Sequence, residues 1–199
     1  EFQKLLLRFG DKIENSMCRD IWLINNYSII IATMDKHLNI STTNTYCKFN
    51  EALQALHDKY IDAELKQHLS RWIGFTSTTE QKLEQDKKTK IDMSQIESIA
   101  KEFKLNWKEK LKIAMKNIRS NFALNVDATI TQQIGQDELF RNQREIKKKF
   151  LTQLLTYHKR FEDVVTKIFQ NQGRNPQIQA LLVPVNTMRY DIKALWDDN

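Results

Sequence analysis

Large apolar residues recur every three or four positions along most of the chain, which is the spacing of one face of an α-helix. The clearest stretch runs from Ser94 to Phe122, where the stripe consists of Ile96, Ile99, Phe103, Trp107, Leu111, Met115, Ile118 and Phe122. A helix with such a stripe has to bury it against other helices, because large apolar side chains are costly to leave in water. The pattern predicts a helical domain and by itself indicates no function.

The same rhythm predicts the other helices and their ends. We expect helices over about Phe2–Lys36, Thr45–Ser70, Thr79–Asp86, Ser94–Phe122, Asp137–Gln170, Gln177–Val183 and Asn186–Trp196. A kink or a close helix approach is expected at Gly10, and Arg71–Thr79 fits either a helix or a turn. Ser94 with Glu97 fits a capping box with Asp92 as a competing cap, and Gly173 is a C-terminal cap candidate.

The chain has only 4 Gly and 2 Pro in 199 residues, which favours long helices over many short strands. We predict an all-α fold, an elongated bundle of five to six mostly long antiparallel helices that forms one domain over residues 1–199. Residues 86–91 are predicted to be a flexible linker and residues 123–137 a loop. Because the chain opens in helical rhythm without an initiator Met, we interpret it as the C-terminal fragment of a longer protein.

The net charge is +6, and a basic stripe accompanies the apolar one on the central helix. Its members, with one off-stripe tryptophan, are the candidate partner or membrane contacts: Lys101, Lys104, Lys108, Lys112, Lys116, Arg119 and Trp22. The favoured interpretation of the lysines is a solvated face, and the alternative is contact with anionic lipid or an acidic partner. For Trp22, a wider buried face is favoured over a partner site. Nucleic acid is not expected, since the aromatics lie on the apolar stripes and not among the lysines.

Candidate chemistry is sparse, and we predict that the protein is not an enzyme and needs no cofactor. His57 and His68 lie eleven positions apart, whereas zinc sites usually place ligands closer together, so both are interpreted as surface or boundary histidines. Cys18 and Cys47 are interpreted as small buried thiols of a reducing compartment. Neither a nucleophile elbow nor a phosphate-cradling glycine loop is present.

Several short pieces, in order, resemble the C-terminal region of the vacuolar protein sorting-associated protein 52 family. They are Trp22 with Leu23-Ile24-Asn25-Asn26-Tyr27, then Phe103, Trp107 and Lys108, then Leu151-Thr152-Gln153-Leu154 with Tyr157-His158-Lys159-Arg160-Phe161, and finally Val185-Asn186-Thr187-Met188 with Ile192-Lys193. Two segments depart from the family. The segment 123–149 is longer than the family usually has between these helices. Residues 39–90 match the family only in helical character, which puts any family interface within residues 39–90 in doubt.

The resemblance implies a non-enzymatic subunit of the Golgi-associated retrograde protein complex, a multisubunit tether that acts in endosome-to-trans-Golgi transport. It implies a helical scaffold and interaction leg that is cytoplasmic and peripheral at trans-Golgi and endosomal membranes. The implied partners are sister tether subunits, with a Golgi Rab GTPase and SNAREs as further candidates and peripheral membrane contact as an option. The alternatives are an exocyst-type tether subunit and a helical module that binds anionic membrane surfaces through its lysines.

Overall fold

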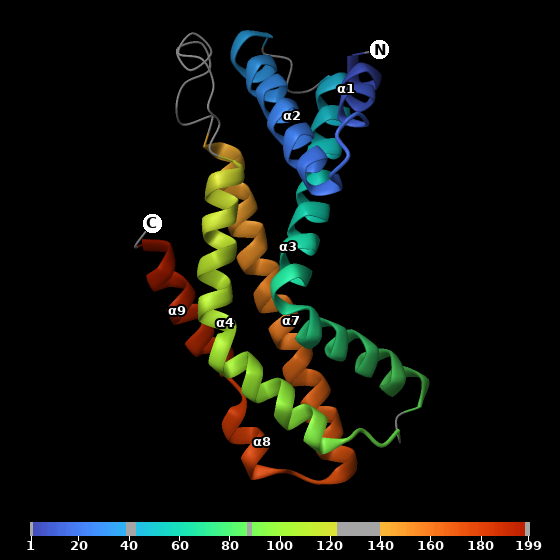
Figure 1. Ribbon diagram of the computed structural model, residues 1–199, viewed down its shortest axis with the longest axis vertical. Helices are drawn as coiled ribbons and strands as arrows, with labels where there is room; N and C mark the ends of the chain where they lie inside the picture. Colours follow the sequence, from blue (N-terminus) through green and yellow to red (C-terminus); the bar gives the residue numbers. More distant parts are fainter. Residues whose placement is uncertain (1, 39–42, 87–88, 123–139, 198–199) are drawn as a thin grey trace. The chain divides into compact units, whose positions relative to one another are not determined.

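The computed structural model describes residues 2–38, 43–86, 89–122 and 140–197. In chain order these residues form α1 (Phe2–Gly10), α2 (Ser16–Leu38), α3 (Asn44–Gln85), α4 (Met93–Asn121), α7 (Arg141–Gln172), α8 (Pro176–Leu181) and α9 (Val185–Asp197) (Figure 1). These ranges contain no strand, so the predicted all-α class is confirmed. None of the helices in them is long and apolar enough to cross a bilayer.

The chain divides into two compact units. The first unit consists of residues 1–64 and 115–149, and the second of residues 65–114 and 150–199. Elongation of the bundle and its assignment as one domain stay predictions. The expected linker at 86–91 falls partly on residues 87–88, and the expected loop at 123–137 falls entirely on residues outside the described ranges.

The prediction of one helix over Phe2–Lys36 is wrong, because the first unit begins with two helices. The chain leaves α1 after Gly10, where an added Cβ would lie 3.3 Å from Cδ2 of Leu23, and α2 starts at Ser16. The Asn15 side chain accepts a hydrogen bond of 2.9 Å from the Cys18 amide, as an N-cap residue does. The break therefore combines the expected close approach at Gly10 with a cap at Asn15 that restarts the helix.

Aromatic and branched side chains fill the core of the first unit. Tyr60 packs edge-on against Phe122 with ring centroids 4.9 Å apart, and its hydroxyl accepts a hydrogen bond of 3.0 Å from Asn121. Tyr27 packs against Phe49 with ring centroids 5.5 Å apart. The most deeply buried side chains here are Ile24, Tyr27, Ile31, Tyr60, Ile118, Phe122 and Ile146. The apolar face of α2 is thus buried as its spacing predicts.

Helix α3 covers both expected helices, Thr45–Ser70 and Thr79–Asp86, and it is kinked at Leu69, one residue before the expected end of the first. Arg71–Thr79 is helical, and the buried Thr76 hydroxyl donates a hydrogen bond of 2.8 Å to the Trp72 carbonyl. That bond satisfies the buried hydroxyl, and the burial of neighbouring apolar side chains offsets the low helix propensity of the Thr-rich run. The one disturbance within α3 is a kink at Leu69, whose φ of −128° and ψ of 24° lie outside the helical range.

In the second unit, the helix ends are set by short-range hydrogen bonds. Asp92 caps α4 by accepting hydrogen bonds from the amide and hydroxyl of Ser94, so Asp92 and not Ser94 is the cap. Gly173 ends α7 with a φ of 94°, which confirms the expected C-terminal cap. Asn175 caps α8 through the amides of Gln177 and Ile178. The expected cap Asn186 is wrong, because α9 already begins at Val185.

Candidate interaction surface

All six basic residues predicted as a contact surface lie on α4 and are exposed. Four of them, Lys101, Lys104, Lys108 and Lys112, belong to the second unit, whereas Lys116 and Arg119 belong to the first. The six basic residues therefore fall into two groups, one in each unit. In the first unit, burial and the nearby charge of Arg119 lower the pKa of Lys147, so basic groups also gather around that end of α4.

Two lysines of the second unit hold the C-terminal helices against α4. Lys104 donates a hydrogen bond of 2.9 Å to the carbonyl of Ala180 in α8. Lys108 forms an ion pair of 2.7 Å with Asp191 of α9, and its ammonium lies 5.7 Å from the centroid of the Trp107 ring. These side chains have structural partners within the unit, so they contribute less to an outward-facing basic surface than the sequence suggests.

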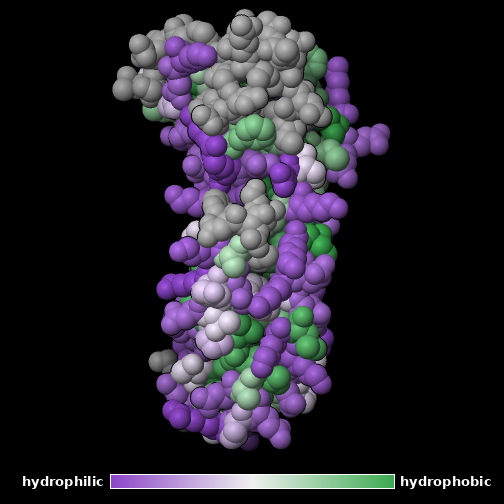
Figure 2. Space-filling view, turned by 90° about the vertical axis from the view of Figure 1, so that its left-hand side faces the viewer, coloured by the Kyte–Doolittle hydropathy of each residue, from purple (hydrophilic) through white to green (hydrophobic). Residues whose placement is uncertain are grey.

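The two other lysines of the second unit, Lys101 and Lys112, lie on one side of α4 together with Leu105. We call these three residues the α4 outer face. These positions share one side of the helix because they are spaced by four and seven residues. Leu105 is 71% exposed, and neither lysine makes a hydrogen bond or ion pair with a described residue. Figure 2 shows hydrophobic side chains that reach the surface between hydrophilic ones on one side of the molecule. The outer face thus combines one exposed apolar side chain with two positive charges.

Trp22, the seventh candidate, lies on α2 in the first unit and is half-buried. Its backbone carbonyl accepts a hydrogen bond of 2.8 Å from the Asn26 side chain, which stays within α2. Its neighbours Leu23 and Ile24 are buried, with exposed fractions of 4% and 0%. Trp22 therefore lies at the edge of the buried face of α2, and no described contact joins it to the basic residues of α4.

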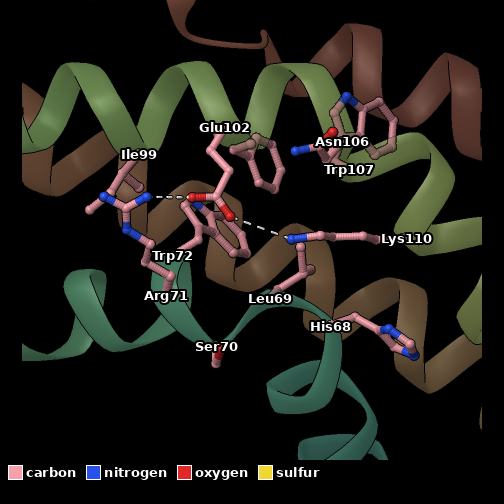
Figure 3. A pocket seen from close by; sticks show the side chains of 11 residues that line it. His68, Leu69, Ser70, Arg71, Trp72, Ile99, Glu102, Asn106, Trp107 and Lys110 are labelled. Carbon is pink, nitrogen blue, oxygen red and sulfur yellow. Dashed lines mark hydrogen bonds and ion pairs between the residues drawn. The ribbon is translucent and has the colours of Figure 1, made fainter.

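A small notch opens beside the kink of α3 in the second unit (Figure 3). Arg71 contacts Glu102 at 2.7 Å, and Lys110 approaches the other carboxylate oxygen of Glu102 at 3.6 Å. Trp72 lines the notch with a buried indole N–H that has no hydrogen-bond partner among the described residues. The cavity measures about 40 Å³, which suits about one water molecule and no organic substrate.

An aromatic stack lies behind this notch and connects α3, α4 and α7. Trp72 stacks on Phe103 with ring centroids 4.4 Å apart, and the imidazole of His158 stacks on Phe103 at 5.2 Å. Nε2 of the fully buried His158 lies 2.6 Å from the Val183 carbonyl, a distance at which the ring N–H donates to the oxygen. Burial lowers the pKa of His158, which favours the neutral ring. The stack is a structural core and contains no reactive pair.

The sequence offered no direct sign of the Arg71, Glu102 and Lys110 contacts. Arg71 lies in a segment whose sequence fits either a helix or a turn, and the ion pairs depend on how α3 packs against α4. Arg160 of α7 likewise pairs with Glu80 of α3 through a bidentate contact that joins residues 80 positions apart. Such pairs can be recognised from sequence only when the helix pairing is already known.

Three predictions about individual side chains are wrong. His57 is 1% exposed and so is not a surface or boundary residue, whereas His68 is partly exposed as expected. Cys18 and Cys47 are exposed and not buried, because each points away from the face that its helix packs. Within the described ranges, no group of three His, Cys, Asp or Glu residues is placed to hold a metal ion.

Two curated proteins are similar to this chain along nearly its whole length. They are vacuolar protein sorting-associated protein 52 A and 52 B of Arabidopsis thaliana, each 24% identical, over 190 and 193 residues, and covering 95% of this chain. The aligned part makes up 24% of the length of each relative, so the chain spans about a quarter of them. No protein-family model matches the chain, and no solved structure matches it.

Proposed function

We propose that this chain, whose sequence is similar throughout to two proteins of the vacuolar protein sorting-associated protein 52 type, is a non-enzymatic part of a vesicle-tethering complex. The observation that carries the proposal is the coverage of 95% of the chain by both relatives. The all-α architecture agrees with the helical rods of which such tethers are built. The finer proposal is a helical scaffold and interaction leg in endosome-to-trans-Golgi retrograde transport, peripheral at those membranes.

The partners in this proposal are the sister tether subunits, with a Golgi Rab GTPase or a SNARE as further ligands of the leg. Support for a protein ligand comes from the α4 outer face. An exposed leucine between two lysines offers an apolar anchor with charges that steer an acidic partner. Lys104 and Lys108 favour this interpretation over lipid binding by the whole stripe, because they bind α8 and α9.

A complementation experiment tests the proposal in cells. The gene that encodes this chain is disrupted, and the full-length protein is returned either unchanged or with the double substitution L105Q/K112E. A receptor that cycles between endosomes and the trans-Golgi network is followed by microscopy. We expect the unchanged protein to restore its Golgi steady state, and the variant to restore it incompletely while still assembling with sister subunits, because the altered side chains are exposed and carry no core contacts.

The matched control is K82E, which reverses the charge of an exposed lysine elsewhere in the second unit. It is expected to restore transport fully. Affinity purification at low and at high salt shows which sister subunits accompany each variant. Normal receptor cycling in the disrupted cells, or recovery of no tether subunit with the unchanged protein at either salt concentration, would contradict the proposed function. Equal rescue by L105Q/K112E and K82E would show that the α4 outer face takes no part in the proposed function.

A further inference from the structure

Helix α1 exposes more large apolar surface for its length than any other helix of the described residues. It has nine residues, and three of them are large apolar side chains that are about half-exposed: Leu5 at 46%, Leu7 at 45% and Phe9 at 49%. Leu5 and Phe9 are four positions apart and therefore form one ridge along the helix. Exposed hydrophobic residues are usually scattered singly, so a ridge on a short helix indicates a surface that something covers.

Positive charge lies directly beside this ridge. Lys4 and Arg8 are exposed and form a second row, one position before the ridge residues. Beyond the helix end, the ammonium of Lys12 lies 5.5 Å from the centroid of the Phe9 ring. No acidic residue occurs within Phe2–Gly10, and the first one after it, Asp11, faces Arg19 at 3.6 Å. The outward side of α1 is therefore apolar and cationic.

The attachment of α1 leaves this side accessible within the first unit. Leu6 is 7% exposed, and Gly10 is buried close to Leu23 of α2, so the helix packs through these two positions. Backbone hydrogen bonds of 2.9 Å from Asp11 to Leu7 and from Ile13 to Gly10 fix the turn that follows. The inward side of the helix is thus used for folding, and Leu5 and Phe9 are not needed for it.

We infer that α1 is a docking element for an anionic lipid surface, with the Leu5–Phe9 ridge entering the headgroup boundary and Lys4 and Arg8 contacting acidic headgroups. Helices that lie in a membrane interface combine an apolar ridge with Lys and Arg along its border. Unlike the α4 outer face with its single leucine, α1 carries two exposed apolar side chains four positions apart that can enter a lipid surface together, and a second copy of α1 would oppose like charges. This inference goes beyond the proposed tethering function and can hold or fail without it.

Flotation of the purified chain with vesicles tests the inference in the absence of any tether subunit. Vesicles of phosphatidylcholine alone are compared with vesicles that also contain phosphatidylserine, at low and at high salt. The unchanged chain should float with the anionic vesicles at low salt and separate from them as salt screens the contact. The substitution K4Q/R8Q should lower binding about fivefold for each cation removed. L5Q/F9Q should lower it about tenfold or more, because two half-exposed apolar side chains no longer leave water.

The matched control is L105Q/K112Q on the α4 outer face, which removes a more exposed leucine and a lysine from the second unit. It should float like the unchanged chain, and circular dichroism should show unchanged helicity for every variant, since all the altered side chains are exposed. A tryptophan introduced as F9W should be quenched by brominated lipids, whereas L105W should not. Loss of binding by the control but not by L5Q/F9Q, quenching of L105W alone, or no flotation of the unchanged chain would overturn the inference.

Discussion

His57 provides the sharpest quantitative prediction, because it is an ionisable side chain in the middle of the first unit. It is 1% exposed, and neither ring nitrogen makes a hydrogen bond of ordinary geometry with the described residues. Burial, with a smaller contribution from the charge of Lys149, lowers the pKa of His57 from 6.5 to about 4. Asn142 and Asp58 oppose this shift only partly. The folded protein therefore holds His57 neutral at a pH where the unfolded chain binds a proton.

The sign and size of the effect follow from these two pKa values. Because the pKa is lower in the folded state, the unfolded chain binds more protons between the two values, and stability falls as pH falls through this window. With 6.5 and about 4, His57 should cost about 2 kcal/mol between pH 7 and pH 5 and about 3 kcal/mol by pH 4. The folded protein keeps its full stability only above pH 6.5, the pKa of the unfolded chain, where His57 is neutral in both states.

The perturbation is H57L, a substitution of similar volume that removes the ionisable ring. At pH 7 it should change the free energy of unfolding by about 1 kcal/mol or less, since no well-formed hydrogen bond is lost. Between pH 7 and pH 5 the difference in free energy of unfolding between the two chains should change by about 2 kcal/mol in favour of the variant. Urea unfolding followed by circular dichroism gives the difference, and hydrogen exchange of amides in α2 locates it in the first unit. Parallel pH profiles for the two chains would refute the reasoning.

The remaining predictions concern the second unit. H158F keeps a ring beside Phe103 but leaves the buried Val183 carbonyl without its donor, so thermal unfolding should show a loss of about 1–3 kcal/mol, with faster hydrogen exchange in α8 and α9. G173A should cost about 1 kcal/mol, because its φ of 94° strains any L side chain. G74A, at a helical position with nothing within 4 Å of an added Cβ, should instead stabilise by about 1 kcal/mol in the same assay. Equal shifts for both glycine variants would contradict this account.

The long helices could be predicted from the sequence because their cores follow the apolar spacing. Ile24, Tyr27 and Ile31 of α2 and the whole stripe of α4 are buried as that spacing requires. The break between α1 and α2 could not be located by spacing alone, since the apolar stripe continues across it. A cap at Asn15 and a close approach at Gly10 decide it, and the second of these depends on Leu23 in another helix.

The error at His57 has a different origin, and the buried Glu64 illustrates the same point. His57 and Glu64 lie on the same side of α3 as Leu53 and Tyr60, so their positions indicated burial although their residue types did not. Glu64 is 1% exposed, and one of its oxygens accepts a hydrogen bond of 2.8 Å from Asn117. Position along the helix was a better guide here than the usual preference of the residue type.

The position of the α4 lysines could be predicted from the sequence, but their partners could not. Periodicity placed the lysines together on α4, and they do lie there. Which of them remain available depends on α8 and α9, whose contacts with Lys104 and Lys108 come from residues about 80 positions further along the chain. A sequence without its tertiary pairing cannot distinguish a lysine that fastens a neighbouring helix from one that faces solvent.

The exposure of Cys18 and Cys47 affects how the assembly state of this chain can be measured. Dissolved oxygen can oxidise surface thiols of two molecules to an intermolecular disulfide when no reductant is present, whatever the affinity of the surfaces that carry them. Covalent dimers formed in this way would be mistaken for a native oligomer in scattering or gel filtration. The same two thiols are convenient attachment points for fluorophores on the first unit, because neither is part of the packed core.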